Sequence, residues 1–146
     1  MAFVATRVSQ VRKRARAGSV SQRSIDRAMR GVYSEFSFRE TGPLCDLLRQ
    51  LFFEGNSALT IRSEVRDAIQ FRQGNLISPT LLSDEGEFDL IFCRNVLIYF
   101  DQLSRKLALQ TLQRLLAPRG YLFGGHAEPL AMFESRLKSV GPTGAF

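Results

Sequence analysis

Hydrophobic residues recur at two spacings along this chain, and together they predict an alternation of helices and strands. Near the N-terminus the helical spacing is carried by four residues: Val4, Val8, Val11 and Ala15. Gly18 then stands where a helix C-terminal cap is common, so the pattern predicts an amphipathic helix over residues 2–17. A second helix is predicted over residues 22–30, with Ser21 as its N-cap and Gly31 at its end.

The middle of the chain predicts one more helix and two short strands. A loop over residues 31–43 leads to a helix that starts at Pro43. One face of this helix is apolar: Leu44, Leu47, Leu48, Leu51 and Phe52. Gly55-Asn56 is a turn signal, and the short apolar runs 59–61 and 69–71 after it suggest a small hairpin.

The C-terminal half has the strongest pattern. Residues 88–93 are a short, continuous apolar block, as expected for a strand that is buried on both faces of a parallel sheet. Asp101 suits the N-cap of a helix over 102–116, and a strand follows at 121–124. This order is a βαβ unit, so we expect an α/β fold with a largely parallel sheet. Two further elements are predicted: a helix over 129–137 and a strand within 138–146.

Polar residues interrupt the apolar block directly after its strand. Arg94 and Asn95 lie between Cys93 and the apolar segment 96–100. Ligands of open α/β sheets bind outside the carboxyl ends of the strands, where the strand order reverses. We therefore expect these two side chains to face a ligand crevice.

Composition limits the function classes. With 146 residues, 45% apolar and 23% charged, the chain suits a single globular domain, and no apolar run is long enough for a membrane span. No secretory signal is recognisable, so a cytoplasmic protein is expected. The distant Cys45 and Cys93 fit reduced thiols rather than a disulfide or a metal site.

The net charge of +6 is concentrated at the N-terminus. Residues 1–30 contain eight basic side chains and one acid, a local charge of +7, which leaves −1 for the remainder. Such a segment either grips phosphates or forms a solvated helix face. No aromatic residues are interleaved with the basic ones, so the solvated face is favoured and nucleic-acid binding is the weaker alternative.

The segments "FDLIFCRNVLIYFD" and "LLAPRGYLFGGHAE" resemble the CheR-type methyltransferases, as do "VSQRSIDRAMRGVYSEFSFR" and "FRQGNL" upstream. The resemblance covers residues 19–146. It implies a Rossmann-like fold, S-adenosylmethionine as cofactor, and methyl transfer to glutamate side chains of chemoreceptors. It also implies a small antiparallel insertion within 33–61, which helps to dock the receptor, and the C-terminal half of the sheet within 66–146.

The resemblance assigns roles residue by residue. Asn75 and Leu76 match the contact beside the adenine, Arg94 and Asn95 match the cofactor crevice, and Tyr99 faces the transferring methyl group. Arg94 and Tyr99 are then the catalytic candidates. Each has a structural alternative: Tyr99 as a core tyrosine, Arg94 as an ion-pair partner of a nearby aspartate, and Asn75 as a turn residue.

The sequence departs from the family near its start. The family's first strand and glycine-containing turn find no match, and Ser19 stands where an acidic residue accepts hydrogen bonds from the ribose. We therefore expect a truncated domain over 1–146, with residues 1–18 as a basic amphipathic helix.

A missing central strand would leave its neighbours unpaired. New strand pairing, a complementing chain or self-association, and a marginal fragment are the open alternatives. A methyltransferase is one functional hypothesis. An inactive remnant or binding module is the second, and a basic nucleic-acid binder the third.

Overall fold

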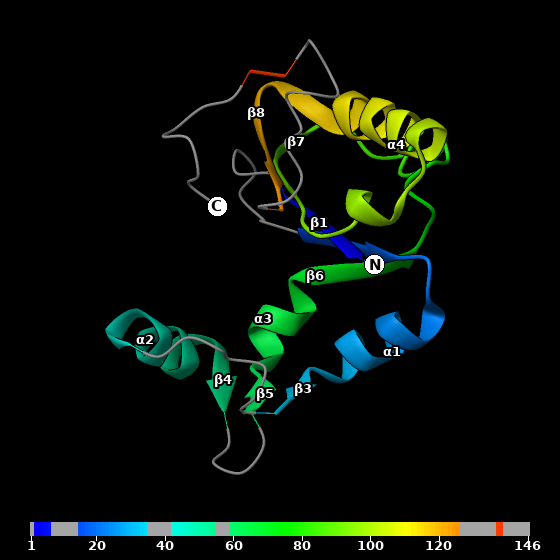
Figure 1. Cartoon of the computed structure of the whole chain (residues 1–146). Coiled ribbons are helices and arrows are strands. Elements are labelled where there is room, and N and C mark those ends of the chain that lie inside the picture. Colours follow the sequence, from blue (N-terminus) through cyan, green and yellow to red (C-terminus); the bar gives the residue numbers. More distant parts are fainter. Residues whose placement is uncertain (1, 7–14, 35–41, 55–58, 126–136, 139–146) are drawn as a thin grey trace.

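The computed structural model describes residues 2–6, 15–34, 42–54, 59–125 and 137–138. Its elements form two groups, each built on its own sheet (Figure 1). The larger group holds a five-stranded sheet and the longest helix, and the smaller holds a three-stranded sheet and three shorter helices. The predicted elements at 129–137 and 138–146 fall almost entirely outside the described residues.

The N-terminal segment forms strands, so the helix predicted over residues 2–17, and with it the basic helix over 1–18, is wrong. Strand β1 is Ala2–Thr6 and strand β2 is Ala15–Ser19, and the two pair antiparallel. Burial in β1 changes between neighbours as in a strand, since Ala5 is fully buried while Val4 is 38% exposed. Helical spacing is a weak guide here because pairing with neighbouring strands overrides it.

The five-stranded sheet has the order β6-β2-β1-β7-β8. Strand β6 is Ile69–Gln73, β7 is Phe88–Cys93 and β8 is Leu116–Gly124. The pairs β2–β6 and β7–β8 are parallel, and β1 runs antiparallel to both β2 and β7. Four strands therefore share one direction, and the chain's own β1 occupies the centre. The chain's own N-terminal segment therefore occupies the position where a strand was expected to be missing, an arrangement that none of the alternatives raised by the sequence describes.

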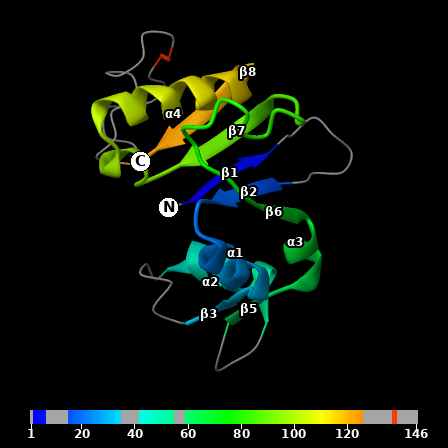
Figure 2. The same cartoon turned by 90° about the vertical axis from the view of Figure 1, so that its right-hand side faces the viewer.

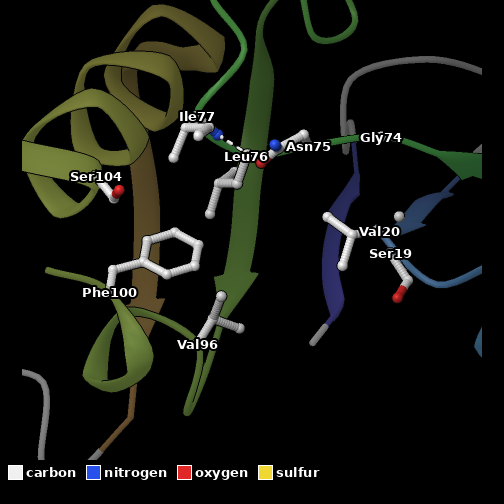
Figure 3. Close-up of a pocket in the computed structure, with 10 residues that line it drawn as sticks. Ser19, Val20, Gly74, Asn75, Leu76, Ile77, Val96, Phe100 and Ser104 are labelled. Carbon is white, nitrogen blue, oxygen red and sulfur yellow. Dashed lines mark hydrogen bonds between the residues drawn. The ribbon is translucent and has the colours of Figure 1, made fainter.

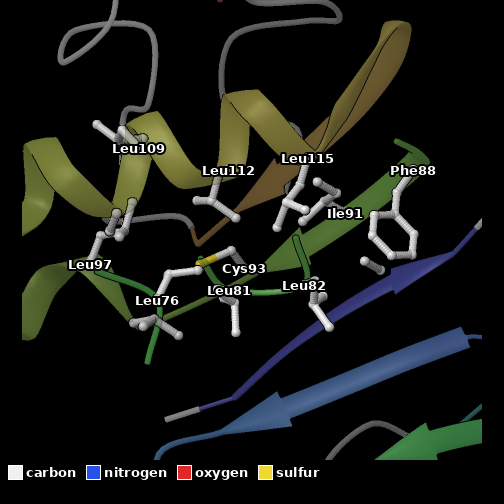
Figure 4. Close-up of a cluster of buried hydrophobic side chains, with 13 residues drawn as sticks. Leu76, Leu81, Leu82, Phe88, Ile91, Cys93, Leu97, Leu109, Leu112 and Leu115 are labelled. Atoms are coloured by element: carbon white, nitrogen blue, oxygen red, sulfur yellow. The ribbon is translucent and has the colours of Figure 1, made fainter. Parts of the chain in front are cut away.

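The βαβ unit predicted at the C-terminal half is confirmed. Helix α4, Gln102–Leu115, connects the parallel strands β7 and β8, and the Asp101 side chain caps it by accepting a hydrogen bond from the Ser104 backbone N–H. Strand β8 begins at Leu116, five residues before the predicted start. The core lies between α4 and the sheet (Figure 4), and its largest fully buried side chains are Phe88, Ile91, Cys93, Leu97, Leu109, Leu112 and Leu115.

The smaller group lies between β2 and β6 in the chain and extends from that side of the large sheet (Figure 2). Helix α1, Gln22–Arg30, is capped by Ser21 and ends at Gly31, whose φ of 65° suits glycine, as predicted. Helix α2, Pro43–Phe52, starts at the predicted proline. Its apolar residues Leu47 and Leu51 are nevertheless 50% and 55% exposed.

The small sheet has the order β3-β5-β4 and is antiparallel. Its strands are β3, Val32–Tyr33, β4, Phe53–Glu54, and β5, Leu59–Ile61, followed by helix α3, Ser63–Asp67. It lies in the part of the chain where an antiparallel insertion was expected. The hairpin suggested between 59–61 and 69–71 is not formed, because β5 pairs with β3 and β4 while β6 pairs with β2.

Candidate functional site

A pocket of about 250 Å³ opens where three segments meet at the carboxyl ends of β2, β6 and β7. Figure 3 shows Phe100 and Ser104 on one side, Ser19 and Val20 on the other, and Leu76 between them. The described residues that line it are Gly18, Ser19, Val20, Gly74, Asn75, Leu76, Ile77, Val96, Phe100 and Ser104. This is the edge at which parallel α/β sheets bind ligands.

Parallel pairing of β2 and β6 brings the first two segments together. Ser19 is opposite Gln73 in the register, so the residues that follow each strand meet at the same edge. The Gly74 backbone N–H donates to the Ser19 carbonyl oxygen at 3.0 Å, and the Gln73 side chain donates to the Val20 carbonyl oxygen at 3.1 Å. These bonds fix the wall formed by Ser19 and Val20 against the loop after β6.

Asn75 and Leu76, the residues predicted beside the adenine, both line this pocket. The Asn75 side-chain oxygen accepts a hydrogen bond from the Ile77 backbone N–H at 3.2 Å, and its carbonyl accepts one from Ser78 at 3.0 Å. Asn75 is therefore also a turn residue, which was the structural alternative to its predicted role. Its side-chain NH₂ group is a donor that this turn bond does not use. Leu76 is 4% exposed and joins the core.

The third wall is the turn after β7. Asn95 has a φ of 55°, a left-handed conformation that asparagine adopts more readily than most residues. The chain then forms the 3₁₀ helix Leu97–Tyr99. Arg105 on α4 holds this turn, because its guanidinium donates to the carbonyl oxygens of Leu97 at 3.2 Å and Phe100 at 3.0 Å.

Three predicted site residues lie on the same turn but not in the lining of the pocket as the described residues form it: Arg94, Asn95 and Tyr99. Arg94 and Asn95 are exposed, and Tyr99 is 69% exposed, so Tyr99 is not a core tyrosine. Val96 and Phe100 on this turn face the pocket instead. The predicted roles of Arg94, Asn95 and Tyr99 stay predictions.

Ser19 is buried and is an element of the pocket wall. It is 5% exposed, and its hydroxyl oxygen accepts a hydrogen bond from the Ser21 backbone N–H at 3.2 Å. Its O–H hydrogen is a donor that this bond does not use. A neutral hydroxyl makes weaker hydrogen bonds than the carboxylate that the family resemblance leads one to expect here.

Charge near the pocket comes from the N-cap of α4. The Asp101 carboxylate accepts from the Ser104 backbone N–H at 2.7 Å, and this bond is the main cause that lowers the pKa of Asp101 below its ordinary value of 3.8. Asp101 is therefore ionised at neutral pH. The pocket lining itself has no ionisable side chain among the described residues.

The structure describes part of the basic N-terminal segment. Of the basic cluster at residues 12–16, Arg16 is described, and it is paired with Glu85 at 2.6 Å with 14% of its side chain exposed. Within the described ranges, no three His, Cys, Asp or Glu side chains gather as a metal site. The same part of the chain holds no helix long and apolar enough to cross a membrane.

Sequence reasoning missed most of the pocket lining, and Val20, Phe100 and Ser104 had no assigned role. The available signal was positional, since Val20 directly follows β2, while Phe100 and Ser104 lie between the end of β7 and the first turn of α4.

Comparison with known proteins gives one family match and several relatives. The model of the family described as "CheR methyltransferase, SAM binding domain" matches residues 1–145. The "Probable biofilm formation methyltransferase WspC" of Pseudomonas aeruginosa is 38% identical over 122 residues, which cover 84% of this chain and 28% of that protein. The "Chemotaxis protein methyltransferase" of Escherichia coli is 31% identical over 131 residues, 87% of this chain and 45% of that protein. This chain therefore spans less than half the length of these relatives.

Proposed function

This chain belongs to the CheR methyltransferase family, and on that premise we propose that it binds S-adenosylmethionine and transfers the methyl group to glutamate side chains of a chemoreceptor or related signalling protein. One observation supports the proposal above others. The two residues that the family resemblance assigns to the adenine, Asn75 and Leu76, line a pocket at the ligand-binding edge of the sheet.

The pocket lining fits the nucleoside part of this cofactor. Val20, Leu76 and Phe100 supply apolar surface, and a base that stacks on an aromatic ring gains about 1–3 kcal/mol. Asn75 and Ser19 supply hydrogen-bond donors for ring nitrogens and ribose oxygens. When bound, the cofactor supplies an electrophilic methyl group on a positively charged sulfur.

The chain's own residues need only position the acceptor. A glutamate carboxylate is ionised at neutral pH, so methyl transfer to it requires no strong general base. The exposed Arg94 guanidinium would hold this carboxylate through two parallel hydrogen bonds, and the Tyr99 hydroxyl would donate to one of its oxygens. Orientation of this kind contributes up to about 7–11 kcal/mol to a reaction barrier.

Titration calorimetry with S-adenosylhomocysteine, together with transfer of radiolabelled methyl groups to a receptor fragment, tests the proposal. Ser104→Trp, which fills the pocket, should abolish binding and transfer. Leu103→Trp adds the same indole one position away at a residue that is 68% exposed and outside the lining, and it should preserve both. Tyr99→Phe and Arg94→Ala should lower transfer. No binding by folded wild-type protein would refute the proposal.

A cofactor-binding module without transfer activity is the second candidate. Two observations favour it: the pocket of about 250 Å³ is smaller than the roughly 300–1,000 Å³ usual for ligand sites, and Arg94 and Tyr99 lie outside its lining. Saturable binding of S-adenosylhomocysteine with no methyl transfer under any receptor concentration would identify this function.

A further inference from the structure

We propose that one face of helix α1 docks an acidic helical segment of the protein substrate, away from the glutamate that is methylated. This arginine face consists of Arg23, Arg27 and Arg30. The inference rests on the proposed function, because it names the surface that recognises the acceptor protein. The described lining of the pocket includes none of the three arginines, so docking and cofactor binding can be measured separately.

The three arginines share one side of α1. They follow one another after four and three residues, so their side chains leave the helix within a sector of about 60°. All three are exposed. Ile25, the buried residue of α1, lies on the opposite side and is 4% exposed. The arginine face is therefore the solvent side of the helix, and it is about 10 Å long.

Helix electrostatics explain only part of this placement. Arg27 and Arg30 lie in the last turn of α1, where a cation interacts favourably with the helix dipole. Arg23 lies in the first turn, where the dipole disfavours a cation and no acidic residue offsets it. The single acid of the helix, Asp26, accepts a hydrogen bond from the Gln22 side chain at 2.8 Å. A partner that brings negative charge would complement all three arginines, including the one that the helix itself disfavours.

Helix α1 begins at the same edge of the sheet as the pocket. Val20 lines the pocket, and Gln22 is the first residue of the helix. Figures 1 and 2 both show α1 below the large sheet, starting from the end of β2. Arg94, at the end of β7 on this edge, is also exposed. A protein that presents a glutamate at the pocket can thus extend along α1, and cations at both places attract the same acidic surface.

Spacing and apolar neighbours favour a protein helix as the partner over a nucleic acid. Carboxylates at positions i, i+4 and i+7 of a partner helix recur at the same distances as the arginines, so each arginine can meet one carboxylate. Met29 and Val32, close to Arg30 in the chain, are 53% and 47% exposed. A protein can cover such apolar side chains, whereas a phosphate backbone cannot. Helix α1 also contains no aromatic residue on which a base could stack.

Two synthetic peptides test this inference. Both are alanine-rich helices with the same number of glutamates, placed on one face at i, i+4 and i+7 in the first peptide and spread around the helix in the second. Fluorescence anisotropy at low salt should show about tenfold tighter binding of the one-faced peptide to the full chain. Added salt should weaken this binding, because exposed charge pairs are screened.

A matched pair of variants locates the binding. Arg27→Glu reverses the central charge of the arginine face and should weaken binding of the one-faced peptide about fivefold or more. Arg119→Glu makes the same charge change at an exposed residue of β8 and should preserve binding. In methyl transfer to a receptor fragment, Arg27→Glu should raise KM for the fragment and leave kcat and S-adenosylhomocysteine affinity unchanged.

The possible failures are distinguishable. Equal binding of both peptides, or unaltered binding and KM in Arg27→Glu, would overturn the inference, while the proposed function stands as long as cofactor binding and transfer persist. Tighter binding of a DNA oligonucleotide of equal charge than of the one-faced peptide would overturn it in favour of a nucleic-acid partner. If folded protein binds the one-faced peptide through Arg27 but neither binds S-adenosylhomocysteine nor transfers methyl groups, the proposed function falls and the acidic-helix site stands.

Discussion

Replacing Glu85 by glutamine should destabilise the protein more than replacing its neighbour Asp84 by asparagine. The guanidinium of Arg16, the second residue of β2, donates through Nε to one Glu85 carboxylate oxygen at 2.6 Å and through Nη2 to the other at 3.1 Å. Only 14% of the Arg16 side chain and 12% of the Glu85 side chain are exposed. The remaining Arg16 nitrogen, Nη1, is buried and has no hydrogen-bond partner within the described part of the chain.

The magnitude follows from this burial. Removing one partner of a fully buried ion pair costs about 3–5 kcal/mol, because the other charge is left uncompensated. Residual exposure of both side chains, together with the one acceptor oxygen that glutamine retains, reduces this cost. We therefore expect Glu85→Gln to lower the free energy of unfolding by about 2 kcal/mol, a large share of the roughly 5–15 kcal/mol typical of a domain.

Urea denaturation followed by circular dichroism measures this change, and the neighbouring residue supplies a matched control. Asp84 pairs with Arg72 on the adjacent strand β6 at 2.9 Å, but these side chains are 60% and 46% exposed. Asp84→Asn should therefore leave stability nearly unchanged. The double variant Arg16→Met/Glu85→Leu should recover most of the loss, because an apolar pair needs no charge compensation. Equal effects of Glu85→Gln and Asp84→Asn would refute the reasoning.

Three further predictions concern β8, the cap of α4 and the pocket turn. Gly120→Ala should cost about 1–3 kcal/mol in urea denaturation, since its Cβ would lie 3.0 Å from two backbone oxygens of β7; an unchanged midpoint would contradict this close approach. Folding lowers the pKa of Asp101, so the stability that its carboxylate contributes is present above the ordinary pKa of 3.8 and is lost as pH falls below that value. In the Asp101→Asn variant, the free energy of unfolding should therefore change less with pH across this range. Arg105→Met should weaken S-adenosylhomocysteine binding about tenfold, or about 1.4 kcal/mol, because the turn after β7 loses both hydrogen bonds from this side chain. Arg105→Lys should lose less affinity than Arg105→Met. Unaltered affinity in the methionine variant would exclude Arg105 as a positioning residue.

The C-terminal half of the fold could be predicted because local signals agree there with the tertiary structure. The apolar block at 88–93 is a buried strand, and Asp101 caps the helix that follows. Local chemistry likewise located α1, whose start at Ser21 and end at Gly31 depend on capping interactions within a few residues. Such signals are carried by adjacent residues and need no knowledge of distant partners.

The N-terminal half could not be predicted in the same way. The helical spacing from Val4 to Ala15 is outweighed by pairing of β1 with β2 and β7, and β7 lies more than 80 residues away in the sequence. The spacing carries no sign of that partner. Strand β1 lies antiparallel at the centre of an otherwise parallel sheet, and no local pattern in the sequence predicts this placement.

The site was predictable to the extent that a motif names residues. Asn75 and Leu76 were assigned by resemblance and line the pocket. Val20 and Phe100 escaped notice because the pocket forms only when β2 and β6 pair in parallel and the turn after β7 closes against them. Apolar side chains of this kind resemble ordinary core residues in the sequence.

The central claim is that the pocket at the ends of β2, β6 and β7 binds the adenosyl group, and amide chemical-shift mapping tests it most directly. A ¹⁵N-labelled sample titrated with S-adenosylhomocysteine should show saturable shifts concentrated at residues 18–20, 74–77 and 96–104, with little change in α1–α3. Saturable shifts centred elsewhere, or none in a folded sample, would contradict the account.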